Sequence, residues 1–222
     1  MKSRIGAVTA LVFALGCSSA QAAPTTVDVR VEGATRTLFE GQVTTDGKLI
    51  EQDKSGPQKC DGTNAGANPT PGPTVTSALD NAVAWDGTWN DQFSDFLVNR
   101  IGTDAGSANA FWTSVLNGQP TTAGGCQVQV KAGDDVLWAY VSQTTNEFLA
   151  LSGPTKVRRG KRFRVKVVDT KTGNAVRGAR VGPARTNANG VAKLRAVKRG
   201  RVTLKARKAG TVRSNAIRIR VR

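Results

Sequence analysis

The stretch TTVDVRVE, residues 25–32, decides how the first part of the chain folds. Valine occupies every second position from Val27 to Val31, and charged residues stand between the valines. A period of two predicts a half-buried β-strand, with one face in a core. Gly33 then turns the chain, and residues 37–43 are expected to return as the partner strand of a hairpin.

A helix and further strands are expected after this hairpin. The helix begins after Pro73-Thr74, and Val75, Leu79 and Ala82 lie on one apolar face of it. Apolar or alternating runs predict strands at residues 96–101, 111–116, 126–130 and 136–141. One helix laid across a sheet predicts an α+β domain over residues 24–150.

Residues 155–222 repeat the alternation without any helical period. The runs RFRVKV (162–167), VTLKAR (202–207) and IRIRVR (217–222) place aliphatic side chains on one face and cations on the other. Turn signals rich in Gly and Asn separate these runs. Short alternating strands at this spacing predict a small all-β sandwich of immunoglobulin-like size.

Charge divides the chain at the same place. Residues 24–154 carry 7 Lys and Arg against 15 Asp and Glu, whereas residues 155–222 carry 23 against one acid, Asp169. All four tryptophans and Tyr140 precede Pro154. Two opposed shifts in composition predict a domain boundary here, with residues 151–154 as the linker.

The first 23 residues have the features of a secretory signal peptide. Lys2 and Arg4 precede an apolar run, and Ala20-Gln21-Ala22 offers a cleavage site. Cys17 makes a lipoprotein the alternative. No later apolar run is long enough to span a membrane, so the mature chain is expected to be secreted, extracellular or cell-wall associated.

Two cysteines, Cys60 and Cys126, remain after removal of the signal peptide. An even pair in an oxidising compartment predicts a disulfide bond, with two free thiols as the alternative. The chain contains no histidine, so Ser-His and Cys-His nucleophile systems are excluded and a metal site lacks ligands. We expect no enzyme activity, no metal and no cofactor.

The alternative activity is that of a hydrolase of envelope polymers, or an accessory to one. Such an enzyme needs carboxylates that converge in one cleft. The candidates are Asp86, Asp91, Asp95, Asp134 and Asp135.

Two sets of side chains are candidates for binding. The aromatic set, for a small-molecule ligand, is Trp85, Trp89, Trp112, Trp138 and Tyr140, with the filling of a core as the alternative. The cationic set is Arg162, Arg164, Lys166, Lys205, Arg207, Arg218, Arg220 and Arg222.

A net charge of +22 on residues 155–222 exceeds what solubility requires. It predicts contact with an anionic cell-envelope polymer or another acidic surface. The alternatives are a solvated surface, or one that docks on the acidic first domain. No helix or aromatic platform accompanies the charge, so sequence-specific nucleic-acid binding is not expected.

Parts of the first domain resemble the transcobalamin-like C-terminal domain family of secreted bacterial proteins. The segments that carry the resemblance are residues 29–33 with 37–39, 77–80, and 111–112 and 117–118 with 133–140. It implies a β-grasp domain of the soluble-ligand-binding kind, adds Asn117 to the candidate ligand residues, and makes cobalamin or another corrinoid an alternative ligand. In the vitamin carriers a helical-barrel domain also holds cobalamin, and these 222 residues contain no counterpart of it.

The second domain is similar to bacterial immunoglobulin-like or carboxypeptidase-regulatory-like modules in residues 173–181, 186–192 and 200–206. This similarity implies a spacer or adhesive unit on a bacterial surface. The expected protein is therefore an exported, non-enzymatic ligand-binding or cell-surface protein.

Overall fold

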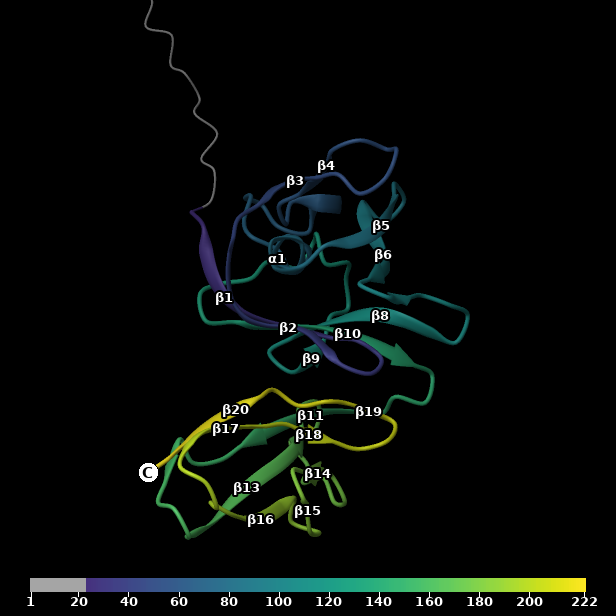
Figure 1. The fold of residues 1–222 in the computed structure, drawn as a ribbon. Coiled ribbons are helices and arrows are strands. Elements are labelled where there is room, and N and C mark those ends of the chain that lie inside the picture. The colour runs from purple at the N-terminus through teal and green to yellow at the C-terminus, as the bar shows by residue number, and fades with distance from the viewer. Residues whose placement is uncertain (1–22) are drawn as a thin grey trace, which may run out of the picture.

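The computed structural model describes residues 23–222, and within them the chain is almost entirely β-structure (Figure 1). Residues 1–22, which include Cys17 and most of the expected signal peptide, lie outside the described residues. The described part has one α-helix, α1 (Val75–Ala82), and one turn of 3-10 helix (Asn64–Gly66). No helix there is long and apolar enough to cross a membrane.

We call residues 25–142 the first unit. Its strands are β1 (Thr25–Glu32), β2 (Thr37–Thr45), β3 (Lys48–Ile50), β4 (Gln58–Cys60), β5 (Trp85–Asn90), β6 (Asp95–Ile101), β7 (Asp104–Ala105), β8 (Ala110–Leu116), β9 (Gln119–Pro120) and β10 (Asp135–Ser142). Five of them form a sheet in the order β2-β1-β10-β8-β9. β5, β6 and β7 form a second sheet, and β3 pairs with β4.

The expectation of an α+β, β-grasp-like domain is wrong. The first unit is nearly all β, because its strands divide among three sheets and its helix has only eight residues. α1 ends at Ala82, and the next residue, Val83, has an extended backbone (φ −151°, ψ 156°) that leads into β5. So short a helix covers little of the five-stranded sheet, and the two smaller sheets close the rest of the core.

The expected strand at residues 126–130 is also wrong. This segment runs beside the start of α1 instead of joining a sheet. The backbone N–H of Val130 donates to the Pro73 carbonyl (2.9 Å), and that of Val75 donates to the Val128 carbonyl (3.0 Å). The Val130 N–H and the Val128 carbonyl therefore find their partners at the helix entry instead of in a sheet.

The first core forms where the alternation of β1 predicts it. Val27, Val29 and Val31 are at most 1% exposed, and they pack with Trp138 of β10 and Leu79 of α1. β10 runs parallel to β1 and β2 runs antiparallel to it.

Two local features hold α1 and its surroundings. Thr74 and Ser77 form a capping box, in which each side chain accepts a hydrogen bond from the backbone N–H of the other. Cys60 and Cys126 form the predicted disulfide bond, which joins β4 to the segment that runs beside the helix entry.

We call residues 147–222 the second unit, which is all β and compatible with the sandwich expected for residues 155–222. Its strands are β11 (Glu147–Ser152), β12 (Lys156–Val157), β13 (Arg162–Asp169), β14 (Arg180–Val181), β15 (Ala184–Arg185), β16 (Val191–Arg195), β17 (Gly200–Leu204), β18 (Ala206–Arg207), β19 (Thr211–Val212) and β20 (Ile217–Val221). The sheet orders are β16-β13-β11-β19, β12-β20-β17 and β15-β14-β18. Leu149 and Leu151 of β11 lie in the core of this unit. The linker expected at residues 151–154 therefore begins inside a strand of the second unit.

The five-stranded sheet lies between two layers, with α1 on one face and the second unit on the other (Figure 1). Alternate residues of β10 show this division. Trp138 belongs to the first core, whereas Leu137 and Val141 pack against Phe148 and Val212 of the second unit. The two units are therefore joined by an apolar cluster.

The second half of β1 is consequently buried on both faces. Arg30 and Glu32 alternate with the core valines, yet they are only 5% and 1% exposed. The prediction of a half-buried strand fails at this end because the second unit covers the polar face.

Candidate functional site

The second unit turns nearly all of its cations outward. On β13, Val165 and Val167 are at most 2% exposed, whereas Arg162, Arg164 and Lys166, at the alternate positions, are exposed. β16 and β20 repeat the arrangement, because each strand alternates aliphatic and basic residues. Strand alternation thus produces a cationic surface over the sandwich.

These cations stand opposite one another across strands. The directly opposed pairs are Arg162 with Arg195, Arg164 with Lys193, Arg201 with Arg220, Lys156 with Arg220, Arg180 with Arg185, and Arg180 with Arg207. All of these side chains are exposed. Each of the three sheets of the second unit therefore carries at least one pair of like charges in register.

Like charges directly opposite one another destabilise a sheet. The second unit contains one acid after Pro154, Asp169, and its side chain is 5% exposed. Its carboxylate accepts hydrogen bonds from the Phe148 backbone N–H (3.0 Å) and the Thr172 hydroxyl (2.8 Å). Asp169 therefore holds nearby backbone and side-chain groups in place, and it does not neutralise the rows of cations on the strands.

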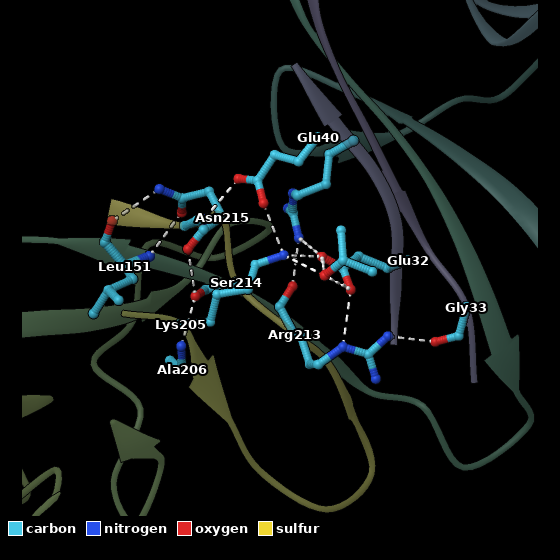
Figure 2. A network of polar contacts seen from close by, with 12 residues as sticks. Glu32, Gly33, Glu40, Leu151, Lys205, Ala206, Arg213, Ser214 and Asn215 are labelled. Carbon is cyan, nitrogen blue, oxygen red and sulfur yellow. Dashed lines mark hydrogen bonds and ion pairs between the residues drawn. The ribbon is translucent and has the colours of Figure 1, made fainter. Parts of the chain in front are cut away.

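Two cations of the second unit turn inward instead, to Glu32 and Glu40 of the first unit (Figure 2). The Lys205 Nζ lies 2.9 Å from the Glu40 Oε2, and the Arg213 Nε lies 2.9 Å from the Glu32 Oε2. Arg30 completes the cluster by donating to the backbone carbonyl of Arg213. These charges fix how the two units pack, and Lys205 is not part of the exposed surface.

The ion pairs within residues 23–222 use few of the basic residues of the second unit. Besides Lys205 and Arg213, only Lys208 forms one, with Glu147 (2.8 Å). The other twenty of the 23 cations after Pro154 form none in the described structure. Docking on the acidic first unit therefore occupies a small share of the charge.

Arg218 is an intermediate case. It lines a hollow of about 540 Å³ between the units, together with Asp28, Glu40 and Asp135 of the first unit. Arg218 thus faces acidic groups of its own chain, unlike the rows on β13 and β16.

The structure separates the predicted cations into groups. Arg162, Arg164 and Lys166 form one row on β13, Arg220 and Arg222 lie at the end of β20, and Arg207 stands opposite Arg180. The sequence prediction missed Lys193 and Arg195, which complete the surface beside β13. The alternation in VAKLR, residues 191–195, carries the signal that would have found them.

The predicted aromatic residues all lie in the first core or pack against it, and four of them make ring contacts. Trp85 and Trp89 both make edge contacts with Phe96, and Trp112 packs against Tyr140 with ring centroids 5.3 Å apart. Trp85, Trp112 and Trp138 are 4–6% exposed. The polar group of each aromatic side chain has a hydrogen-bond partner within the protein. The indole N–H groups of Trp85, Trp89, Trp112 and Trp138 donate to Asp80, Asp91, the Asp104 carbonyl and the Val75 carbonyl, in that order, and the Tyr140 hydroxyl donates to the Ala105 carbonyl.

Asn117 also has local partners. Its amide N–H donates to Asp134 (2.9 Å), and its side-chain oxygen accepts from the Asp135 backbone N–H (2.9 Å). With φ at 51°, Asn117 occupies the left-handed region that a tight turn requires. A ligand role for Asn117 and the aromatic residues stays a prediction.

The candidate carboxylates have structural partners as well. Asp86 pairs with Arg100 (2.7 Å) at the surface, and Asp91 accepts from the Trp89 indole. Asp95 is 4% exposed, and burial raises its pKa to about 6, although the Phe96 and Cys126 backbone N–H groups bind it. In this arrangement Asp95 ties β6 to the disulfide.

No family model matches the chain, and a comparison with curated proteins finds no match either. The resemblances of the two units to known families therefore stay predictions.

Proposed function

We propose that the protein is an exported, non-enzymatic binding protein whose second unit attaches it to an anionic polymer of the cell envelope. The observation that carries the proposal is the set of twenty cations that form no ion pair within residues 23–222, ten of which stand in directly opposed like-charge pairs across strands. Neighbouring strands lie about 5 Å apart, within the Debye length of about 8 Å at physiological salt, so the fields of the rows add. A polyanion relieves this repulsion by binding.

The surface formed by β13 and β16 is the best candidate for the contact. It carries Arg162, Arg164, Lys166, Lys193 and Arg195, all exposed. Figure 1 shows these strands on the side of the second unit that faces away from the first unit. A long polymer can therefore approach them without meeting the acidic unit.

Two features support export. The disulfide between Cys60 and Cys126 is compatible with an oxidising compartment. The first residues have the pattern of a secretory signal peptide. An exported protein meets phosphate- and carboxylate-rich polymers in the envelope, which gives the cationic surface a partner.

Chromatography on heparin tests the proposal with the mature chain, residues 24–222. One variant replaces Arg162, Arg164, Lys193 and Arg195 by Gln. A matched control replaces four exposed cations of the first unit, Arg36, Lys54, Lys59 and Lys131, by Gln. Both changes lower the net charge equally, so only the position of the charge differs.

We expect the surface variant to elute at clearly lower salt, while the control elutes close to the wild type. The dependence of log K on log salt should become shallower by about 3, because each lost contact removes slightly less than one released counterion. Equal effects of both variants would show that net charge alone governs retention, and the proposal would then be wrong.

A further inference from the structure

The two main sheets of the second unit leave an apolar hollow at one edge of the sandwich. It measures about 460 Å³ and lies between β16, the edge of one sheet, and β17 and β20 of the other. Residues 196–198 of the β16–β17 connection also line it. A volume of this size is in the range of small-molecule sites.

The side chains around this hollow are apolar but incompletely covered. Phe163, Val202 and Leu204 line it and are only partly buried, and Val197 at its mouth is 67% exposed. Ile219, 1% exposed, lies deeper in it. Burial of apolar surface stabilises a protein by roughly 25 cal/mol per Å², and this stabilisation is lost where the surface stays in contact with water. A small sandwich is therefore expected to fill such a space with its own side chains unless another molecule occupies it.

Cations surround the same hollow. Lys193, Arg195 and Lys198 line it, and all three are exposed. None of them forms an ion pair with any residue in the range 23–222. Long basic side chains lay their methylene stems on apolar surface and keep their charges at the rim. An apolar interior with a cationic rim is complementary to a molecule with an apolar chain and an anionic head.

We propose that this hollow binds the acyl chain of a phosphate-bearing lipid of the cell envelope, with the phosphate held by Lys193, Arg195 and Lys198. This inference rests on the proposed function, because Lys193 and Arg195 belong to the same cationic surface. The inference specifies the anionic partner further, as a molecule in which the phosphate is attached to an acyl chain. The cationic surface of β13 and β16 would then contact the phosphate groups of the envelope lipids, while the hollow binds the acyl chain of one lipid.

Calorimetric titration of the mature chain with alkyl phosphates below their micelle concentrations tests the inference. The probes are inorganic phosphate, octyl phosphate, decyl phosphate and, as the uncharged counterpart, decyl maltoside. Each methylene that enters the hollow should tighten binding by up to about four-fold, and the heat-capacity change should become more negative with chain length. Decyl maltoside should bind much more weakly than decyl phosphate.

The variant Val197→Asp places an anion at the mouth of the hollow. Because Val197 is 67% exposed, the change leaves the fold intact, and we expect at least ten-fold weaker binding of decyl phosphate. Leu49→Asp is the matched control, since Leu49 is 65% exposed on the first unit, and it should bind like the wild type.

Retention of Val197→Asp on heparin separates this inference from the proposed function. If heparin binds but affinity is the same for inorganic, octyl and decyl phosphate, the hollow takes no chain and only this inference fails. Equal affinity for decyl phosphate and decyl maltoside would also overturn it, because the cationic rim would then have no role. Loss of heparin binding by the wild-type chain would instead overturn the proposed function.

Discussion

The two units differ in what they do with charge. In the first unit the acids are used for structure: Glu32 lies in a buried ion cluster, Asp95 binds backbone N–H groups, and Asp134 holds a turn. In the second unit most of the cations extend into solvent, and several stand opposite one another. The ion cluster around Glu32 in the first unit contributes to folding, whereas the opposed like charges of the second unit act against it.

This difference gives each unit a distinct sensitivity to mutation. Removing Glu32 from the ion cluster of the first unit should destabilise the protein, because the cations that it pairs with are left unmatched. Removing a charge from the rows of the second unit should stabilise it, because a repulsion disappears. The sign of the change in the free energy of unfolding therefore tests whether the cationic surface contributes to the stability of the fold or is retained for binding a partner.

The largest effect is expected at Glu32. Glu32→Gln removes the carboxylate shared by Lys205 and Arg213 and leaves their charges, and that of Arg30, at the interface between the units. Breaking a buried ion pair from one side costs about 3–5 kcal/mol. Urea unfolding at pH 7 should show a loss of this size.

Glu147→Gln is the control for this prediction. It makes the same chemical change in the Lys208–Glu147 pair, in which the side chains are 35% and 27% exposed. An ion pair so exposed contributes about 0–1 kcal/mol. If Glu32→Gln cost no more than Glu147→Gln, the interface would not depend on the ion cluster.

The burial of Asp95 predicts a dependence of stability on pH. Burial raises its pKa from 3.8 to about 6 in the folded protein. The folded state thus binds the proton more tightly than the unfolded state, so the contribution is fully present below pH 4 and is lost as the pH rises through 6. The expected size is roughly 2–3 kcal/mol, at 1.4 kcal/mol per pKa unit.

Asp95→Asn removes this titration while keeping the shape of the side chain. The wild type should therefore lose about 2–3 kcal/mol relative to the variant between pH 4 and pH 7, measured by urea unfolding at both values. Asp86→Asn, at an exposed carboxylate, controls for the general effect of losing an acid. A constant difference between wild type and Asp95→Asn would contradict the assignment.

Sequence alternation predicted local structure well but not what covers each face. The valines of β1 and the basic row of β13 lie where their period of two placed them. Arg30 and Glu32 looked like a solvated face, and they are buried because residues about 180 positions later pack over them. Such a contact depends on the docking of two units, which no local pattern encodes.

The same limit explains the errors in fold and site. A short helix between strands predicted an α+β domain, and the family resemblance implied a β-grasp, but the split into several sheets depends on pairings between distant segments. Lys205 has the same local pattern as Arg207, yet it turns toward Glu32. The hollow beside β16 arises from the separation of two sheets, so its lining residues share no local signal.

The smallest effect, of opposite sign, is expected at Arg164. Arg164 stands directly opposite Lys193, and both side chains are exposed. Arg164→Gln keeps a polar side chain and removes the repulsion, so the free energy of unfolding should rise by about 0.2–1 kcal/mol at low salt. The gain should vanish in 0.5 M salt, where the Debye length falls to about 4 Å.

Arg100→Gln is the matched control in the first unit, where the exposed arginine pairs with Asp86. It should lower stability slightly or leave it unchanged, because an exposed ion pair contributes about 0–1 kcal/mol. Thermal unfolding of both variants at low and high salt resolves the two signs. A destabilised Arg164→Gln at low salt would show that the cation belongs to the fold. If Arg164→Gln is more stable than the wild type but binds polyanions less well, then Arg164 lowers the free energy of unfolding and contributes to binding.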